Sequence, residues 1–418
     1  MAYTGLMPLA GKTREWLQDI TNLYVITENR DAQGFSMSGM QIYYSNSLYQ
    51  QIETILSVNY YDTYPVGSPS FTPAISSQSP VLTDNMNLEL RTKGLPLASY
   101  VKNIEDDNWT KNYSYYDTRG RIIATHSINH LGGYTQTESR LDFAGLAQQT
   151  ITRHKRLSTD TERVITETFE YDAQNRLKVH KHKVDSNPEE ILAQNEYNEL
   201  SQLTTKKVGG SSLGTGLQDI NYTYNIRGWM TQINDPANLG TDLFGYAIRY
   251  TNPQYTSLAS AKYNGNIAEV DWKTSKDGIL KKYSYQYDGL NRLLSGIYTE
   301  PFSTIPQNNS YNETLSYDLN GNITSLQRNS YLEYVGLQQM DSLTYTYTGN
   351  QLNTVTDSSS NYFGYPDSSG NLMHYDLNGN MTDHVDKGIL QINYNHLNLP
   401  DYVKSFTDIE KTLKICFD

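Results

Sequence analysis

The stretch Tyr317-Asp318-Leu319-Asn320-Gly321-Asn322-Ile323 is one copy of a short phrase that the chain repeats about ten times. The phrase is Tyr, then Asp or Asn, two variable residues, then Gly or Asn, and shortly afterwards an aliphatic residue. Most neighbouring copies begin about 25 to 30 residues apart. A period of this size indicates one supersecondary unit stacked many times. The other clear copies begin at Tyr116, Tyr171, Tyr287 and Tyr375, looser copies at Tyr197, Tyr224, Tyr347 and Tyr394, and a degenerate one at Leu141.

Each copy reads as the turn of a β-hairpin. The residue two before the motif Tyr is often also Tyr, and positions i and i+2 of a strand share a face. The Asp suits the first position of a type I turn, where its carboxylate caps backbone N–H groups. Gly or Asn three residues later tolerates the left-handed conformation that the turn requires, and the aliphatic residue starts the return strand.

The prediction is therefore an all-β chain, in which antiparallel hairpins form a curved, spiralling sheet. We expect positive φ at Gly120, Gly321 and Gly379, and end strands with an unpaired edge. We also expect continuous rows of tyrosine rings, about 4.8 Å apart where strands are adjacent, formed by Tyr115, Tyr171, Tyr224, Tyr287, Tyr317, Tyr347 and Tyr375. The repeat residues that carry this prediction are Tyr116, Asp117, Gly120, Tyr171, Asp172, Tyr224, Asn225, Gly228, Tyr287, Asp288, Tyr317, Asp318, Gly321, Tyr375, Asp376 and Gly379.

Composition excludes several classes of protein. The chain has 36 Tyr against 9 Phe and 4 Trp, which suits a thin sheet whose rings keep one end in water. The net charge of −12 argues against nucleic acid as a partner. A single cysteine, Cys416, excludes an internal disulfide framework. No stretch approaches the ~20 apolar residues of a membrane span, and the first residues lack the pattern of a signal peptide.

The chain separates into an irregular segment, residues 1–94, and a repeat array, residues 95–418, continuous with it in one elongated body. Residues 14–23 are predicted to form a short amphipathic helix. Tyr60-Tyr61-Asp62-Thr63-Tyr64 is interpreted as a divergent repeat. Residues 65–80, rich in Pro and Ser, are predicted to be a long exposed loop.

The sequence contains no strong pattern of catalytic, metal-binding or phosphate-binding residues. The spacing of Asp318, Asn320 and Asn322, repeated from Asp376, resembles part of a calcium loop but lacks its Gly and Glu, so a capped turn is favoured. His180 and His182 share a strand face as a possible metal pair without a third ligand. His126 and His130 have no nucleophile signature beside them, and the Gly-rich stretch 209–216 lacks the Lys-Ser/Thr ending of a phosphate loop. We therefore expect no enzyme, no cofactor and no bound metal.

The motif resembles that of the rearrangement-hotspot (RHS) or YD-repeat family over roughly residues 95–418. Family-like phrases outside the bare repeat add to the resemblance; they are residues 129–133 (NHLGG), 224–230 (YNIRGWM) and 263–274 (YNGNIAEVDWKT). The resemblance implies a hollow β-shell that encloses a C-terminal toxin. Related shells occur in insecticidal toxin complexes and in the teneurin receptors.

The family's core motif after the repeats, of Asp-Pro-x-Gly type, is not found, and Asp235-Pro236 lies amid the repeats without the Gly. We therefore expect the chain to be a segment of a longer protein. The resemblance implies a structural scaffold whose partners are a toxin or other polypeptide cargo, the remaining repeats of the parent protein and a secretion apparatus. It also implies a secreted or cell-surface location in a bacterium. The alternative is a surface-displayed module that binds glycans or another cell.

Overall fold

The computed structural model describes residues 2–6, 11, 13, 15–16, 18–19, 28–46, 52–75, 78–87, 90–104, 106–366 and 369–405. The chain divides into two compact units, Met1–Asp219 and Ile220–Asp418, and each is described by itself. The end of the chain with Cys416, and most of the predicted helix 14–23, lie outside the described residues. Glu15, Trp16, Gln18 and Asp19 are helical, and the Trp16 amide donates to the Thr13 hydroxyl, 3.2 Å away.

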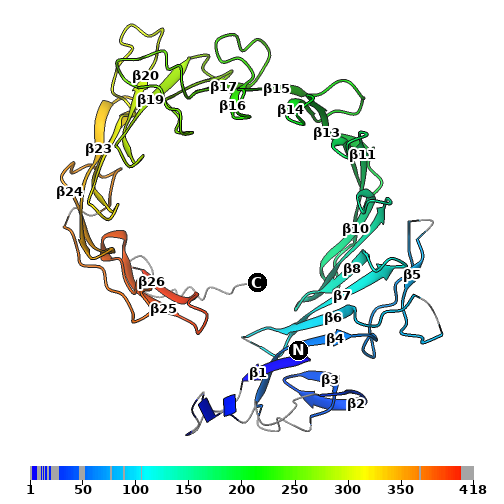
Figure 1. Ribbon diagram of the computed structural model, residues 1–418. Coiled ribbons are helices and arrows are strands. Elements are labelled where there is room, and N and C mark those ends of the chain that lie inside the picture. Colours follow the sequence, from blue (N-terminus) through cyan, green and yellow to red (C-terminus); the bar gives the residue numbers. More distant parts are fainter. Residues whose placement is uncertain are drawn as a thin grey trace. The chain divides into compact units, whose positions relative to one another are not determined.

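The first unit is a sheet in which chain neighbours pair antiparallel, in the order β1-β4-β6-β7-β8-β9 and then β10 to β14 (Figure 1). A short strand, β5, pairs with the end of β7, and the β2–β3 hairpin forms a small separate sheet. The bounds are β1 (Tyr3–Leu6), β2 (Arg30–Met37), β3 (Met40–Tyr44), β4 (Thr54–Tyr61), β5 (Pro80–Val81), β6 (Pro96–Lys102), β7 (Trp109–Asp117), β8 (Ile122–Ile128), β9 (Gly132–Leu141), β10 (Ala147–Leu157), β11 (Arg163–Tyr171), β12 (Leu177–Val184), β13 (Glu190–Tyr197) and β14 (Leu203–Val208).

The second unit repeats this arrangement from β15 to β24, each strand antiparallel to the next, and adds the β25–β26 hairpin. The bounds are β15 (Gln218–Tyr224), β16 (Met230–Ile233), β17 (Phe244–Arg249), β18 (Glu269–Thr274), β19 (Lys281–Tyr287), β20 (Leu293–Thr299), β21 (Glu313–Tyr317), β22 (Ile323–Leu332), β23 (Gly336–Thr348), β24 (Gln351–Asp357), β25 (Ile389–Tyr394) and β26 (Pro400–Ser405), with a 3-10 turn, η1 (Val385–Lys387). The predicted all-β, antiparallel class is confirmed, while the curvature of the sheet stays a prediction. In the described part of the chain β1 pairs only with β4, and β26 only with β25.

Rows of stacked rings exist, but the prediction that motif tyrosines build them was wrong. Of the seven tyrosines that the prediction named, six make no ring contact with one another in the described part of the chain: Tyr115, Tyr171, Tyr287, Tyr317, Tyr347 and Tyr375. Motif tyrosines recur only once per hairpin, on every second strand, so about 10 Å of sheet separates them. The rows instead use rings from successive strands. One runs through Tyr60, Tyr100, Tyr113, His126 and Tyr134, with centroids 5.1–6.4 Å apart, and another through Trp272, Tyr283, Tyr298 and Tyr311.

The described residues of the Pro- and Ser-rich segment 65–80 form a loop up to Pro80, as predicted, but the loop is only partly exposed. Tyr61, at the end of β4, pairs with Pro96, at the start of β6. Residues 62–95 therefore connect these two strands in place of the short turn that connects the strands of the other hairpins. Phe71 and Ile75 are only 6% and 4% exposed, and the Phe71 ring stacks on Tyr115 at 4.7 Å. The segment folds onto the sheet because its few apolar side chains find a partly covered aromatic surface there.

Candidate functional site: the repeat turns

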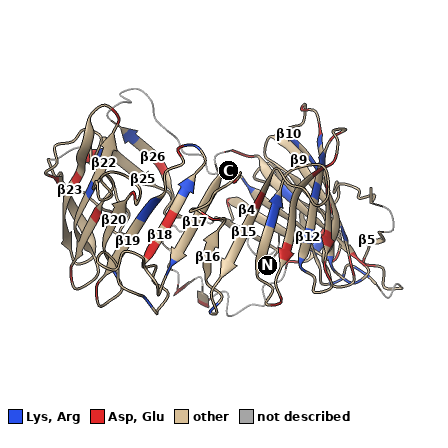
Figure 2. Cartoon of the chain, turned by 90° about the horizontal axis from the view of Figure 1, so that it is seen from above, with Lys and Arg blue, Asp and Glu red and all other residues tan. Residues whose placement is uncertain are grey.

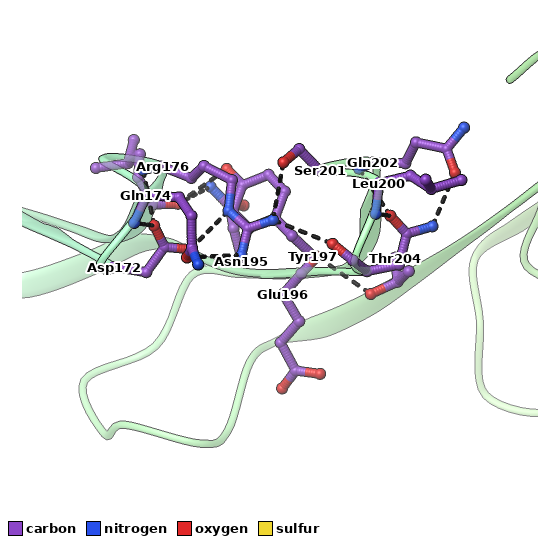
Figure 3. Close-up of polar contacts among 12 residues, drawn as sticks. Asp172, Gln174, Arg176, Asn195, Glu196, Tyr197, Leu200, Ser201, Gln202 and Thr204 are labelled. Atoms are coloured by element: carbon purple, nitrogen blue, oxygen red, sulfur yellow. Dashed lines mark hydrogen bonds and ion pairs between the residues drawn. The ribbon is translucent and has the colours of Figure 1, made fainter.

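The motif Asp holds its turn together through both carboxylate oxygens, as Asp172 illustrates (Figure 3). Its Oδ1 accepts the backbone N–H groups of Gln174 and Arg176, each at 2.9 Å, and its Oδ2 accepts the Arg176 Nε at 2.6 Å. The same double backbone cap is made by Asp117, Asp288, Asp376, Asn129, Asn198, Asn225 and Asn395. Asn suffices at this position because one side-chain oxygen makes the cap.

Hydrogen bonds to these carboxylates favour their charged form. Burial alone would raise the pKa of Asp117, but the backbone N–H groups of Arg121 and Arg119 and the Arg121 guanidinium outweigh it and lower that pKa. Three residues after the Asp, the backbone turns left-handed as predicted, with φ of 73° at Gly120, 93° at Gly321 and 86° at Gly379. Asn175 and Asn291 take the same conformation without Gly, at 61° and 66°.

The motif Tyr reaches back to the preceding hairpin. Tyr317 donates its hydroxyl to the Leu293 carbonyl at 2.8 Å, and Leu293 is the first residue of the previous return strand. A β-bulge lies directly before Tyr317, as it does before the other strand-ending motif tyrosines. Equivalent hydroxyl bonds of 2.7–3.0 Å are made by Tyr116, Tyr171, Tyr197, Tyr287, Tyr347, Tyr375 and Tyr394. Phe lacks this donor, which explains why the chain uses Tyr.

The residue four after the Asp reaches forward to the next turn, a role that our sequence reasoning missed. Arg176 Nη1 donates to the Asn198 carbonyl at 3.1 Å while its guanidinium lies over the Tyr197 ring, 4.8 Å from the centroid (Figure 3). Arg292 repeats both contacts, with the Asp318 carbonyl at 2.7 Å and the Tyr317 ring at 4.8 Å. The signal was present, since Arg or Asn directly precedes the aliphatic residue in every clear copy.

Where this position is Asn, amide groups make the forward link. Asn322 Nδ2 donates to Asp318 Oδ2 at 2.8 Å and to Asn350 Oδ1 of the next turn at 3.2 Å. Asn380 Nδ2 likewise lies 3.0 Å from Asn398 Oδ1. In the five clear copies, the turn is thus bonded to the hairpin before it through Tyr and to the turn after it through Arg or Asn. This arrangement fixes the spacing of hairpins and carries no reactive group.

All of the sequence-predicted repeat residues lie in such turns. Tyr116 and Asp117 end β7, and Tyr171, Tyr224, Tyr287 and Tyr317 end β11, β15, β19 and β21. Asn225 caps the amides of Arg227 and Trp229, and Gly228 has a φ of 78°. The Tyr375 copy has only an isolated bridge, to Met381, yet keeps its Asp376 cap and its hydroxyl bond to Leu352.

The other candidate residues are occupied by structural contacts. Both Asp318 oxygens bind within the turn, which leaves no open calcium loop. His180 and His182 bind different carboxylates, Glu167 at 2.9 Å and Glu190 at 3.3 Å. No group of three or more His, Cys, Asp or Glu able to hold a metal ion occurs among the described residues.

The histidine and Gly-rich candidates also have structural places. His126 belongs to the ring row of the first unit, and burial lowers its pKa. In the stretch 209–216 the Gly214 amide donates to the Gln194 side chain at 2.7 Å. None of the helices in the described ranges is long and apolar enough to cross a membrane.

A buried cluster of charges in the second unit had no signal in the sequence. Figure 2 shows charged positions of both signs on the strands β18 and β19. Lys282, 1% exposed, places its Nζ 2.6 Å from both Glu269 Oε1 and Asp271 Oδ1. Arg249 Nη1 lies 3.2 Å from Glu269 and 2.7 Å from Asp271, so two cations balance two anions. Burial alone would raise the pKa of Glu269, but Lys282 and two backbone N–H groups outweigh it and lower that pKa.

Glu269 also fixes the long connection between β17 and β18. Its carboxylate accepts the amides of Gln254 and Tyr255 at 3.1 and 2.8 Å. Glu138 does the same for the 62–95 connection, accepting the amides of Ala74 and Ile75 at 2.9 and 2.8 Å. Buried carboxylates therefore tie long insertions to the sheet in both units.

Comparison with known proteins gives a likeness of fold. No family model matches the chain, and no curated protein matches it. Among solved structures, the crystal structure of TcdB2-TccC3 without its hypervariable C-terminal region matches with a TM-score of 0.51 and 13% identity. That match covers 84% of this chain and 17% of the solved one. The crystal structure of TcdB2-TccC3-TEV matches with a TM-score of 0.51 and 12% identity, over 86% of this chain and 17% of the other.

The chain has the fold of this TcdB2-TccC3 segment. The likeness covers most of the chain, although the chain spans only about a sixth of the solved proteins' length. It agrees with the RHS/YD-repeat resemblance that the repeated turns indicated. At 12–13% sequence identity, this match supports a shared fold and does not by itself indicate a shared function.

Proposed function

We propose that the chain is a structural scaffold, part of the wall of a β-shell that encloses a polypeptide cargo such as a C-terminal toxin. The observation that carries the proposal is the two-way bonding of successive turns. Because the turns of the five clear copies bind both the hairpin before and the turn after, the array can extend without a deep core. The fold likeness to TcdB2-TccC3 supports the same assignment.

The proposal includes the remaining repeats of the parent protein as partners and a secreted or cell-surface location in a bacterium. It assigns no catalysis to the chain. The role of the shell wall is to keep proteases away from the cargo. The wall can do this only while neighbouring hairpins remain paired in register.

Protease protection of the cargo in the full-length parent protein tests the proposal. We expect the segment that follows the repeats to resist trypsin in the native protein. Tyr287→Ala combined with Tyr317→Ala removes two backward bonds and should make that segment cleavable. Leu319→Ala, at a fully exposed side chain of the same turn, is the matched control and should leave protection unchanged. A cargo that is equally cleavable in the native protein contradicts the proposal.

A further inference from the structure

The chain contains three Asn-Gly pairs, and they begin at Asn264, Asn320 and Asn378. In such a pair the backbone nitrogen of the glycine can attack the side-chain carbonyl carbon of the asparagine, because glycine has no side chain to obstruct the approach. The attack forms a cyclic succinimide and releases the side-chain nitrogen as ammonia. Water then opens the ring to aspartate or isoaspartate, so each pair is a potential site of chemical modification.

Two of the pairs lie in motif turns, where the glycine amide is already used. The Gly321 N–H donates to the Asp318 carbonyl at 3.2 Å, and the Gly379 N–H donates to the Asp376 carbonyl at 3.1 Å. The glycine nitrogen must lose this proton when it attacks, so the turn hydrogen bond has to break first. The motif turn therefore protects the pair within it, although both asparagines are exposed.

The third pair lies outside the motif turns, in the connection between β17 and β18. The partly exposed Gly265 donates its amide to no residue in the described part of the chain. The exposed Asn264 accepts the Asn266 amide on its Oδ1 at 3.1 Å. This bond closes a ring of atoms that contains both Asn264 Cγ and the Gly265 nitrogen, so it keeps the side-chain carbonyl folded back over that nitrogen. It also stabilises the negative charge that develops on Oδ1 during the attack.

We propose that Asn264 is a site of spontaneous deamidation in the folded protein and reacts ahead of Asn320 and Asn378. The Gly265 nitrogen forms a bond to Asn264 Cγ, and the bond from Cγ to Nδ2 breaks. The Nδ2 group leaves as ammonia with the proton that Gly265 gives up, and one water molecule opens the ring. This modification is separate from the scaffold function and does not rest on it.

The modification removes a contact between two segments of the second unit. Asn264 Nδ2 donates at 2.6 Å to Oδ1 of Asn291, which belongs to the turn between β19 and β20. A carboxylate in place of this amide can only accept hydrogen bonds, so it loses that link. Asn266 Nδ2, 3.2 Å from the same oxygen, is then left to hold the two segments together.

Peptide mapping by mass spectrometry, on the purified chain incubated in mildly alkaline buffer, tests the proposal. A deamidated peptide gains the mass difference between an oxygen atom and an NH group, and labelling by isoaspartyl methyltransferase identifies isoaspartate. We expect Asn264 to react about two- to tenfold faster than Asn320 or Asn378, because a turn hydrogen bond contributes about 0.5–1.5 kcal/mol. In concentrated urea, where no turn remains, the three rates should converge.

A product variant tests the lost contact. Asn264→Asp should lower the urea midpoint of unfolding. Asn320→Asp is the control and should leave the midpoint unchanged, because this exposed side chain makes no hydrogen bond to a described residue. An unchanged midpoint for Asn264→Asp would overturn the structural consequence.

Two results would overturn the modification site itself. Deamidation at Asn264 that is no faster than at the other two pairs in the folded chain would mean that the free Gly265 amide does not select the site. A rate advantage that persists unchanged in urea would assign the selection to the flanking sequence instead of the structure.

Discussion

Replacing Lys282 by Met should destabilise the second unit more than any substitution at an exposed charge. Lys282 Nζ is the shared partner of Glu269 and Asp271, each 2.6 Å away, and Met removes this cation while keeping most of the volume. Glu269 is 0% and Asp271 3% exposed, so both carboxylates lose a partner that water does not replace. Arg249 remains as the single cation beside two anions.

The magnitude follows from the burial of the pair. Breaking a buried ion pair by removing one partner costs about 3–5 kcal/mol. For a unit of this size each kcal/mol lowers the melting temperature by roughly 2–4 °C, so we expect a fall on the order of 10 °C. Lys281→Met is the matched control, because Lys281 is the neighbouring residue and pairs with the partly exposed Asp277. Surface pairs contribute about 0–1 kcal/mol, so its melting temperature should change by no more than about 4 °C.

Thermal unfolding followed by circular dichroism gives both values. Asp271→Asn, added to Lys282→Met, removes one of the two unpaired negative charges and should recover part of the lost stability. Equal melting temperatures for Lys282→Met and Lys281→Met would refute the reasoning. They would mean that the buried cluster contributes no more than a surface pair.

Four further outcomes are expected. In urea titrations, Gly321→Ala should lower the free energy of unfolding by about 1 kcal/mol, because the φ of 93° at this position disfavours a side chain. Gly289→Ala, at a glycine without positive φ, should leave the free energy of unfolding unchanged. Tyr317→Phe should cost about 0.5–1.5 kcal/mol through the lost bond to Leu293, and an unchanged urea midpoint would contradict that bond. Burial raises the pKa of Tyr283 to about 12, so the stability that its burial contributes is complete below pH 10 and is lost as pH rises towards 12. Other buried tyrosines also have raised pKa values, so Tyr283→Phe should lower the late component of the absorbance change at 295 nm by one tyrosine without removing it. The partners of Glu269 lower its pKa below the ordinary value of 4.5. The ionised Glu269 therefore contributes to folding stability above pH 4.5, and this contribution is lost as the pH falls further. Glu269→Gln should make the melting temperature depend less on pH in the acid range.

The sequence predicted the features that depend on contacts between residues close together in the chain. An Asp that caps its own turn and a Gly or Asn at positive φ act within five residues, so the turns and the antiparallel class could be recognised without the structure. The i+4 arginine was visible as well. Its partner is the carbonyl of the next turn, some 22 residues on at Arg176, and no local rule indicates that contact.

The errors concern contacts between distant segments. Ring rows depend on which strands are adjacent, and counting one tyrosine per hairpin placed the rows on the wrong residues. Segment 65–80 has the composition of a loop, yet Phe71 and Ile75 are buried because Glu138, more than 60 residues later, accepts its backbone amides. The charges of Arg249, Glu269, Asp271 and Lys282 meet only when β17, β18 and β19 pair. Groups that converge across strands leave no periodic mark in the sequence.

A reconstruction of the full-length parent protein by cryo-electron microscopy tests the scaffold function most directly. We expect the strands of both units to form part of a closed β-wall, with polypeptide density inside it that belongs to a segment outside the repeats. An open sheet with no enclosed polypeptide, and with the sequence after the repeats exposed to solvent, would contradict the proposed function.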